Sequence, residues 1–477
     1  MNSSFLLAAP EILVLVMACV VLCVDVFLRE SRRGIIHMIS MLTLIFAAIL
    51  TLRGGGTVGV EGMTAFEGAF VRDAMGDVLK LFAYLTLALV YIYSKFYLRN
   101  LKMFRADFYT LTLFSLLGVM LLISANTLVT AYLGLEMTSL ASYALVAFNR
   151  DSKPGSESAM KYFVLGSMAS GLLLYGMSMV YGATGSLSLP VISEAVTAAG
   201  REDILLVLGL VFMVAGIAFK LGVTPFHMWV PDVYHGAPLA ATLFISTVPK
   251  LAAFALAFRL LADGMGALHS DWQQMLALLA VASLAVGNLA AIMQSNIKRM
   301  LAYSTIGHMG FVLLGLLPGT AYGYGASMFY VIVYALMSAA AFGMLILLSG
   351  KGVDIEELDD LKGLNQRHSW YAAVMGMVMF SMAGIPVFVG FFGKWLVIKS
   401  VLDAGMLWAA IVAVVFSVIG AFYYLRVVKL MYFDEPATEE RLSPPVDFSA
   451  AISLNGALMI GLGLFSSSLI AMCMNAF

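Results

Sequence analysis

The sequence predicts an all-α polytopic membrane protein, and three observations carry this prediction. Hydrophobic residues make up 62% of the 477 residues and charged residues only 12%, whereas about 25% of a soluble globular protein is charged. Uncharged runs of roughly 20 residues, the length that spans a bilayer as a helix, recur along the whole chain. These runs do not alternate between polar and apolar residues, which excludes a transmembrane β-barrel. The same composition excludes a water-soluble enzyme.

Fourteen such runs are predicted to be membrane spans. The first has no basic segment before it and no cleavage site, so we expect a retained helix and not a signal peptide. In chain order the spans are Phe5–Leu28, Ile35–Leu52, Met75–Tyr97, Phe108–Ile123, Thr127–Phe148, Ser158–Tyr181, Ile204–His235, Leu239–Ala262, Gln274–Met293, Met300–Leu317, Tyr324–Leu348, Tyr371–Leu402, Met406–Tyr432 and Ala450–Met474.

The 27 lysines and arginines are distributed unequally between the loops. Loops after even-numbered spans hold only Arg53, Arg72 and Arg201. Loops after odd-numbered spans, with the adjoining span ends, hold Arg29, Arg32, Arg33, Lys95, Arg99, Lys102, Arg105, Arg150, Lys153, Lys298, Arg299, Lys351, Lys362, Arg367, Arg426, Lys429 and Arg441. The positive-inside rule therefore predicts that this basic side is cytoplasmic and that both termini are periplasmic.

Four charged residues lie deep in the predicted spans, where each costs about 2.5–3.5 kcal/mol to insert. Lys220, Lys250 and Lys394 are too far from a span end to reach the interface, and Glu136 is the one carboxylate assigned to this depth. One acid cannot neutralise three lysines in fixed pairs, so the set favours proton transfer. A static salt bridge that only holds helices together is the alternative.

Four further basic residues lie within about two helical turns of a span end. We expect their side chains to extend along the helix until the charged group reaches the membrane surface. These residues are Lys80, Lys161, Arg259 and Lys399.

The seventh and twelfth spans are predicted to be broken. Each runs for about 32 residues, or about 48 Å as a helix, across a hydrocarbon core of about 30 Å. Each contains a proline, Pro225 or Pro386, which removes a helical hydrogen bond and displaces the carbonyl four residues before it. Freed backbone at membrane depth must be buried in protein or line a cavity. We expect the carbonyls of Leu221 and Met382 to accept from lysine side chains or water.

Two broken helices five spans apart indicate a duplicated unit. Spans 4–8 and 9–13 would be five-helix repeats, and an odd number of helices per repeat requires inverted topology. The predicted divisions are 1–107 for spans 1–3, 108–262 for the first repeat, 263–432 for the second, and 433–477 for a loop and span 14.

Two histidines are candidate members of a proton path, because imidazole changes charge near neutral pH. His308 lies in the middle of the tenth span, and His227 directly follows the break in the seventh. For His308, a structural hydrogen bond to a backbone carbonyl is the alternative.

The sequence holds no Walker loop, no C-x-x-C and no spacing typical of a metal site, so no cofactor or metal is expected in this chain. The near equality of 27 basic and 28 acidic residues argues against nucleic-acid binding.

One long motif resembles a known family. The stretch Phe219–Pro238, FKLGVTPFHMWVPDVYHGAP, is similar to the signature of the antiporter-like membrane subunits of respiratory complex I. Leu135–Met137, Asn296–Ser304 and Gly390–Trp395 are also similar to that family. The resemblance is strong across spans 4–13 and rests on hydropathy alone at the two ends. The sequence lacks the extra C-terminal spans and lateral helix of the largest member.

The resemblance implies a proton-translocating, non-redox membrane subunit of a bacterial NADH–quinone oxidoreductase in the inner membrane. Glu136 and Lys220 would form the charge pair, Lys250 the central relay and Lys394 the outlet-side lysine. NADH, FMN, iron–sulfur clusters and quinone would be bound by partner subunits, and sibling antiporter-like subunits would be neighbours. Two alternatives stay open: a subunit of a sodium–proton antiporter or membrane-bound hydrogenase, and a scaffold without conduction.

Overall fold

The structure is a computed structural model that describes residues 3–29, 32–55, 62–349, 354–436 and 444–477. Lys351 and Arg441, both assigned to the basic side, lie outside the described residues, as does the side chain of Arg201.

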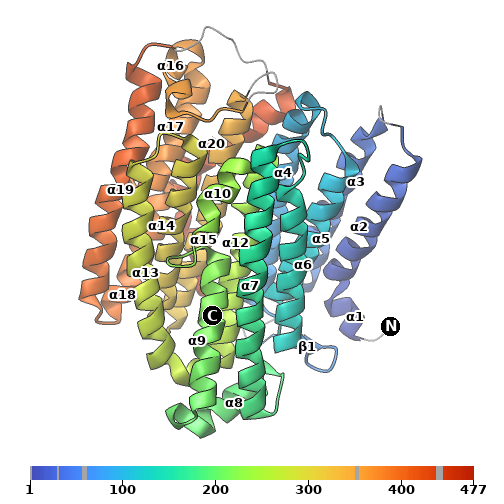
Figure 1. The fold of residues 1–477 in the computed structure, drawn as a ribbon, viewed down its shortest axis with the longest axis vertical. Coiled ribbons are helices and arrows are strands. Elements are labelled where there is room, and N and C mark those ends of the chain that lie inside the picture. Colours follow the sequence, from blue (N-terminus) through green and yellow to red (C-terminus); the bar gives the residue numbers. More distant parts are fainter. Residues whose placement is uncertain (1–2, 30–31, 56–61, 350–353, 437–443) are drawn as a thin grey trace.

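The described chain forms a bundle of long helices that run side by side (Figure 1). The helices are α1 (Ser3–Leu7), α2 (Ala9–Phe27), α3 (Gly34–Gly55), α4 (Ala74–Asn100), α5 (Ala106–Ile123), α6 (Leu128–Val146), α7 (Lys153–Thr184), α8 (Leu189–Ala199), α9 (Ile204–Leu221), α10 (Trp229–Gly236), α11 (Leu239–Ile245), α12 (Val248–Ala257), α13 (His269–Ile292), α14 (Ile297–Leu316), α15 (Ala321–Leu348), α16 (Leu364–Arg367), α17 (Ser369–Ala383), α18 (Val389–Asp403), α19 (Leu407–Phe433), α20 (Val446–Leu464) and α21 (Ser466–Met474). The strands β1 (Met63–Ala65) and β2 (Phe70–Arg72) pair in an antiparallel hairpin. Short 3-10 or π segments are η2 (Gly200–Glu202), η3 (Phe258–Gly264), η4 (Gly266–Leu268) and η5 (Leu358–Leu361).

The prediction of an all-α polytopic membrane protein is confirmed. Within the described residues, 11 helical segments are long and apolar enough to cross a membrane. The other predicted spans fall on α6, α14 and the broken pair α17–α18. The total of fourteen crossings stays a prediction.

The bundle has two ends, and the basic residues divide between them. At the hairpin end, defined by β1 and β2, α1 contacts β1 and the Phe477 ring packs 4.9 Å from that of Phe258, so both termini lie there. At the opposite, basic end, Lys95 near the end of α4 pairs with Asp447 at 2.9 Å. Arg72 of β2 lies at the hairpin end and Lys95 at the opposite end, as the parity of their loops predicts, while the compartment each end faces stays a prediction.

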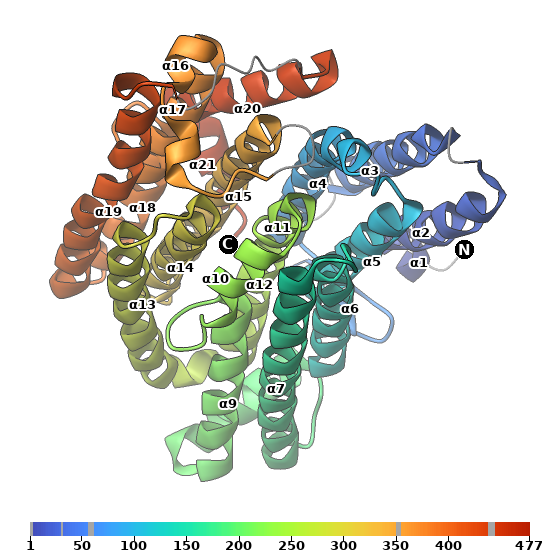
Figure 2. The ribbon, with the colours of Figure 1, turned by 45° about the horizontal axis from the view of Figure 1, so that its top comes forward.

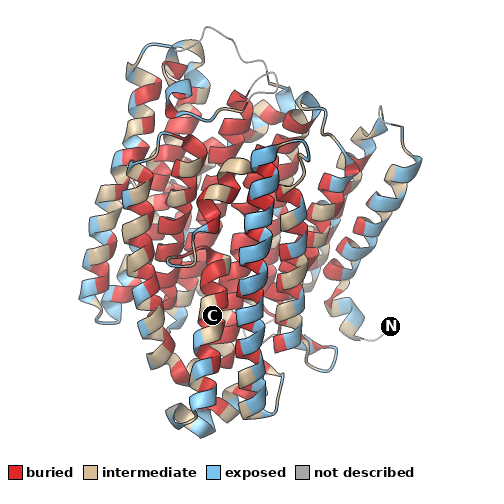
Figure 3. Ribbon diagram, in the orientation of Figure 1, coloured by how far each residue is buried: buried red, intermediate tan, exposed pale blue. Residues whose placement is uncertain are grey.

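Burial places α15 at the centre. The whole of its most apolar window is buried, and it contacts α4, α12, α14, α17 and α18. In contrast, α7 and α19 carry exposed faces at the periphery (Figures 2 and 3). Charges on α12, α14 and α18 are thus surrounded by protein, where they need polar partners.

Three local features were not predicted. The hairpin and α8 lie in loops that the sequence left without regular structure, and the predicted span 14 is divided at Phe465 into α20 and α21. α8 buries Leu189, Ile192 and Val196. The spacing of these three residues in the sequence is helical, but the apolar segment is too short to be predicted as a membrane span.

Candidate functional site

Both predicted helix breaks are present near the middle of the bundle. α9 ends at Leu221 and α10 begins at Trp229, while α17 ends at Ala383 and α18 begins at Val389. A third break, between α11 and α12, lies at residues 246–247.

A glycine, and not the proline, ends each of the first two broken helices. Gly222 has φ +77° and Gly384 has φ +85°, a left-handed conformation that only glycine adopts at little cost. Their N–H groups donate to Ala218 O at 2.9 Å and Phe380 O at 3.1 Å. This is the usual glycine C-cap, and each proline follows within three residues.

Lys250, near the start of α12, lies against the first break. Its Nζ donates to Leu221 O at 2.8 Å and lies 3.5 Å from Lys220 O. The side chain is 1% exposed, and Nζ is 5.2 Å from the centre of the Trp229 ring. The expectation that a lysine would satisfy the Leu221 carbonyl is confirmed, and the lysine comes from the following span.

Lys394, on α18, does the same at the second break. Its Nζ donates to Ala383 O at 2.9 Å and to Ser417 Oγ, on α19, at 3.0 Å. The expected acceptor, Met382, is wrong by one residue, because the glycine cap moves the helix end beyond the position that the proline alone would set. The ammonium also lies 5.4 Å from the centre of the Phe311 ring.

Lys220 and Glu136 lie on neighbouring elements but do not form a direct ion pair among the described contacts. The Lys220 Nζ donates to Ser139 Oγ at 2.6 Å, and Ser139 follows Glu136 by three residues on α6. The Oε1 atom of Glu136 is buried and has no hydrogen-bond partner in the described part of the chain. The alternative of a static salt bridge therefore finds no direct contact between these two residues, and a serine hydroxyl accepts the hydrogen bond from the ammonium instead.

His308 is held by tyrosines and not by a backbone carbonyl, so that alternative is wrong. Its Nδ1 lies 2.7 Å from the Tyr330 hydroxyl and its Nε2 lies 2.9 Å from the Tyr424 hydroxyl. The Tyr424 hydroxyl also lies 2.5 Å from Ser304 Oγ. The ring is 4% exposed, and it joins α14, α15 and α19 through hydroxyl groups that both donate and accept protons.

His227 lies in the segment between α9 and α10, as predicted, but apart from the His308 cluster. It is half-buried, and its Nδ1 has no hydrogen-bond partner among the described residues.

On α15, hydroxyl groups lie between the surroundings of Lys250 and those of Lys394. The Tyr334 hydroxyl donates to Thr305 Oγ1 at 2.8 Å, and the Tyr334 ring lies 5.3 Å from the His308 ring. Further along α15, Ser338 Oγ donates to Ser246 Oγ at 3.2 Å, at the break between α11 and α12. Because α15 contacts both α12 and α18, these groups connect the surroundings of Lys250 and Lys394.

Two small cavities adjoin this path. One, of ≈ 10 Å³, is lined by Lys220, Ser139, Tyr143 and Ser170. The other, also ≈ 10 Å³, is lined by Lys394, His308, Ser304, Ser417 and Tyr424. A cavity of about 10–15 Å³ is the least that holds one water, so each lysine has room for a single bridging molecule.

Two basic side chains that were expected to reach the membrane surface are buried in the protein instead. Lys80 is 1% exposed and pairs with Glu11 Oε1 at 2.7 Å. Arg259 is 4% exposed and pairs with Asp73 at 2.6 Å and Asp263 at 3.0 Å. The expectation failed because the partner carboxylates come mostly from other elements, which spacing within one span cannot reveal.

Glu11 lies near the start of the first span and is also buried, at 4% exposed. The sequence offered one sign of the Lys80–Glu11 pair: Glu11 is an acid near the start of span 1, and Lys80 is a lysine near the start of span 3. Lys161 and Lys399 are exposed, as expected.

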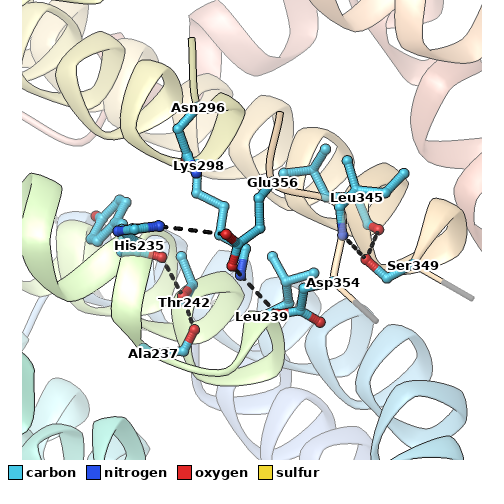
Figure 4. A network of polar contacts seen from close by, with 12 residues as sticks. His235, Ala237, Leu239, Thr242, Asn296, Lys298, Leu345, Ser349, Asp354 and Glu356 are labelled. Atoms are coloured by element: carbon cyan, nitrogen blue, oxygen red, sulfur yellow. Dashed lines mark hydrogen bonds and ion pairs between the residues drawn. The ribbon is translucent and has the colours of Figure 1, made fainter. Parts of the chain in front are cut away.

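At the basic end, the segment before η5 contacts the end of α10 and the start of α14 (Figure 4). Lys298 Nζ pairs with Asp354 at 2.7 Å, and His235 lies 3.7 Å from Glu356. The backbone of Ile297 donates to Glu356 O at 2.7 Å.

Comparison with known proteins gives a consistent family. Residues 125–420 match the family described as NADH:quinone oxidoreductase/Mrp antiporter, TM. NADH-quinone oxidoreductase subunit N of Thioalkalivibrio sulfidiphilus is 52% identical over 473 residues, which cover 99% of this chain and 98% of the relative. The subunit N of Thiobacillus denitrificans is 52% identical over 469 residues, covering 98% and 96%.

Solved structures agree. A chain of respiratory complex I from Thermus thermophilus with bound aureothin has a TM-score of 0.82 and 32% identity, covering 97% of this chain and 98% of that one. A chain of the Mrp complex from Dietzia sp. has a TM-score of 0.86 at 21% identity, covering 100% and 97%, which shows a shared fold alone. The resemblance seen in the motifs is confirmed, and both of these relatives are named NADH-quinone oxidoreductase subunit N.

Proposed function

The chain belongs to the family of NADH-quinone oxidoreductase subunit N, within the wider NADH:quinone oxidoreductase/Mrp antiporter family, and from this premise we propose how it moves protons. It is an antiporter-like membrane subunit of NADH-quinone oxidoreductase. The proposal is that Glu136, Lys220, Lys250, His308 and Lys394 form a proton relay driven by quinone reduction in partner subunits.

The observation that carries this proposal is the environment of the lysines. Lys250 and Lys394 are bonded to backbone carbonyls or hydroxyls, and Lys220 to a hydroxyl. Neutral acceptors leave each ammonium free to give up its proton and stay hydrogen-bonded as an amine. A static pair would instead need a carboxylate to fix the charge.

Glu136 is the proposed switch. Glu136 precedes Ser139, the serine that accepts from Lys220, by three residues on α6, which is less than one helical turn. A side-chain rearrangement on α6 or α9 would let the Lys220 ammonium leave this serine and pair with the Glu136 carboxylate. An ion pair at about 4 Å is worth about 4 kcal/mol at an effective dielectric constant of 20. Moving one charge through about 150 mV costs about 3.5 kcal/mol. Opening and closing this pair therefore matches the work of moving one proton.

From Lys220 the proton would pass to Lys250, which already contacts the Lys220 carbonyl. The hydroxyls of α15 and the imidazole of His308 then lead toward Lys394. Single waters in the two cavities would complete the hydrogen bonds. His227 is proposed only as a side branch, because it lies apart from these contacts.

Energy must come from partner subunits, since we propose no redox group in this chain. We further propose that the basic end faces the cytoplasm, that both termini are periplasmic, and that spans 4–8 and 9–13 are inverted repeats.

The test uses the assembled complex in inverted membrane vesicles. Glu136→Gln and Lys220→Ala are each expected to lower NADH-driven proton uptake by roughly tenfold, the effect of about 1.4 kcal/mol on the barrier. NADH oxidation by an acceptor that takes electrons before quinone reports assembly and should stay unchanged.

Glu157→Gln is the matched control, because Glu157 is an exposed acid on α7 with its side chain 69% exposed. Wild-type pumping by the Glu136→Gln complex would refute the switch.

A further inference from the structure

A cavity of ≈ 400 Å³ lies at the basic end, apart from the relay, where α2, α5 and α6 meet. Figure 2 shows these helices together at one side of the bundle. The cavity is lined by Leu22, Arg105, Asp107, Thr110, Leu111, Ala144, Ala147, Phe148 and Arg150. Nothing in the proton path uses it.

Its mouth is positively charged. Arg105 and Arg150 come from different helix ends, both are exposed, and neither has a salt bridge or side-chain hydrogen bond within the described residues. Asp107 also lines the cavity, so the lining carries a net charge of one positive unit. That charge balances a phosphodiester, with one negative charge, better than a phosphate monoester with nearly two.

The first turn of α5 adds donors. Arg105 occupies the N-cap position and makes no side-chain capping bond, so the N–H groups of the first turn are available to an anion.

A buried hydroxyl is a second, independent sign of a ligand. Thr110 is 6% exposed and lines the cavity, yet its Oγ1 has no hydrogen-bond partner in the described part of the chain. A helical threonine usually bonds the carbonyl four residues before it, and leaving a hydroxyl unsatisfied costs about 1–3 kcal/mol.

The remaining walls are apolar and open to the outside of the bundle. Leu22 is 50% exposed and faces the same cavity as Leu111 and Phe148. A free phosphate ion has nothing to gain from these walls, whereas an acyl chain does.

We propose that this cavity binds one anionic phospholipid. Its phosphodiester contacts Arg105, Arg150 and the first turn of α5, and an acyl chain lies against Leu22 and Leu111. A lipid bound there would link α2 to α5 and α6 at the level of the lipid headgroups.

The experiment uses the whole complex in nanodiscs that contain a phosphatidylglycerol with a photoactivatable diazirine on its acyl chain. Adducts are expected on peptides of α2, α5 and α6. Arg105→Ala with Arg150→Ala should weaken labelling about 30-fold, because each arginine near an anionic lipid contributes about 1 kcal/mol. Ala144→Phe, which keeps both arginines and narrows the cavity, should weaken labelling even if the double variant assembles poorly.

Arg32→Ala with Lys153→Ala is the matched control: it removes two exposed basic residues of the same end that do not line the cavity, and labelling should persist. Unlabelled phosphatidylglycerol should compete. Undiminished labelling of both the double variant and Ala144→Phe would overturn the site. Competition by inorganic phosphate, or equal competition by phosphatidylcholine, would overturn the anionic phospholipid as its occupant.

Discussion

Lys394 donates to one carbonyl and one hydroxyl, and neither acceptor carries a charge. Arginine can keep hydrogen bonds of this kind but cannot lose its proton, because its pKa exceeds 12. We therefore expect Lys394→Arg to lower proton uptake more than Lys394→His, whose proton can leave. A difference of roughly tenfold would correspond to about 1.4 kcal/mol.

The measurement is the rate of proton uptake per NADH oxidised in inverted vesicles. Wild-type pumping by the arginine variant would show that Lys394 only supports the fold.

The buried Lys80–Glu11 pair predicts a stability effect and no direct effect on proton transfer. Removing one partner strands a charge that is 1–4% exposed, and breaking a buried pair costs about 3–5 kcal/mol. Lys80→Met should lower the thermal midpoint of the purified complex, and adding Glu11→Gln should restore most of the loss.

Lys161→Ala is its control, because that lysine is exposed and pairs with an exposed acid, Glu157, and a half-buried one, Asp232. A double variant no more stable than Lys80→Met alone would contradict the pairing.

Among single residues, the three lysines and Glu136 that we propose as a relay were singled out in the sequence by depth alone. It could not identify their partners, because Ser139, Ser417 and the tyrosines around His308 are ordinary helix residues until the fold brings them together.

The first helix break depends on a glycine that touches the relay. A Cβ at Gly222 would lie 2.7 Å from Val230 Cγ2 and 3.4 Å from Lys250 Nζ, in addition to the strain of φ +77°. The clash with Val230 and the backbone strain should shift the end of α9, whose Leu221 carbonyl accepts from Lys250. Gly222→Ala is therefore expected to lower pumping severalfold, the effect of about 1 kcal/mol or more on the barrier.

Gly185→Ala separates crowding from strain. Gly185 ends α7 with φ +67° and has nothing within 4 Å of its Cβ position, so this variant carries only the left-handed cost of about 1–2 kcal/mol in stability. Equal pumping by the two variants would show that the break does not position Lys250.

The breaks themselves were predictable from length and proline, but their exact ends were not. Proline marked the segment, while the glycine cap set the last helical residue and so decided that Ala383, and not Met382, meets Lys394.

The orientation of the entire bundle is tested by labelling single cysteines with a membrane-impermeant maleimide. In a background without Cys19, Cys23 and Cys473, Thr64→Cys in the exposed hairpin should react in intact spheroplasts. Lys153→Cys, at the basic end, should react only in inverted vesicles. The reverse pattern would place the termini in the cytoplasm.

The sequence by itself determined the membrane class, the long apolar helices and the two broken helices, and it predicted the parity of the loops. These follow from local quantities: run length against bilayer thickness, the loss of an N–H at proline, and the charge of each loop. Its motifs also indicated the family. Only the tertiary structure decided which groups meet. In the fold, Lys250 donates to a carbonyl on α9, Lys220 donates to Ser139, and Lys80 pairs with Glu11. A charged cavity forms where α2, α5 and α6 meet. Each of these contacts joins residues at least 29 positions apart or in separate helices, and packing in three dimensions, not spacing along one helix, satisfies a buried charge.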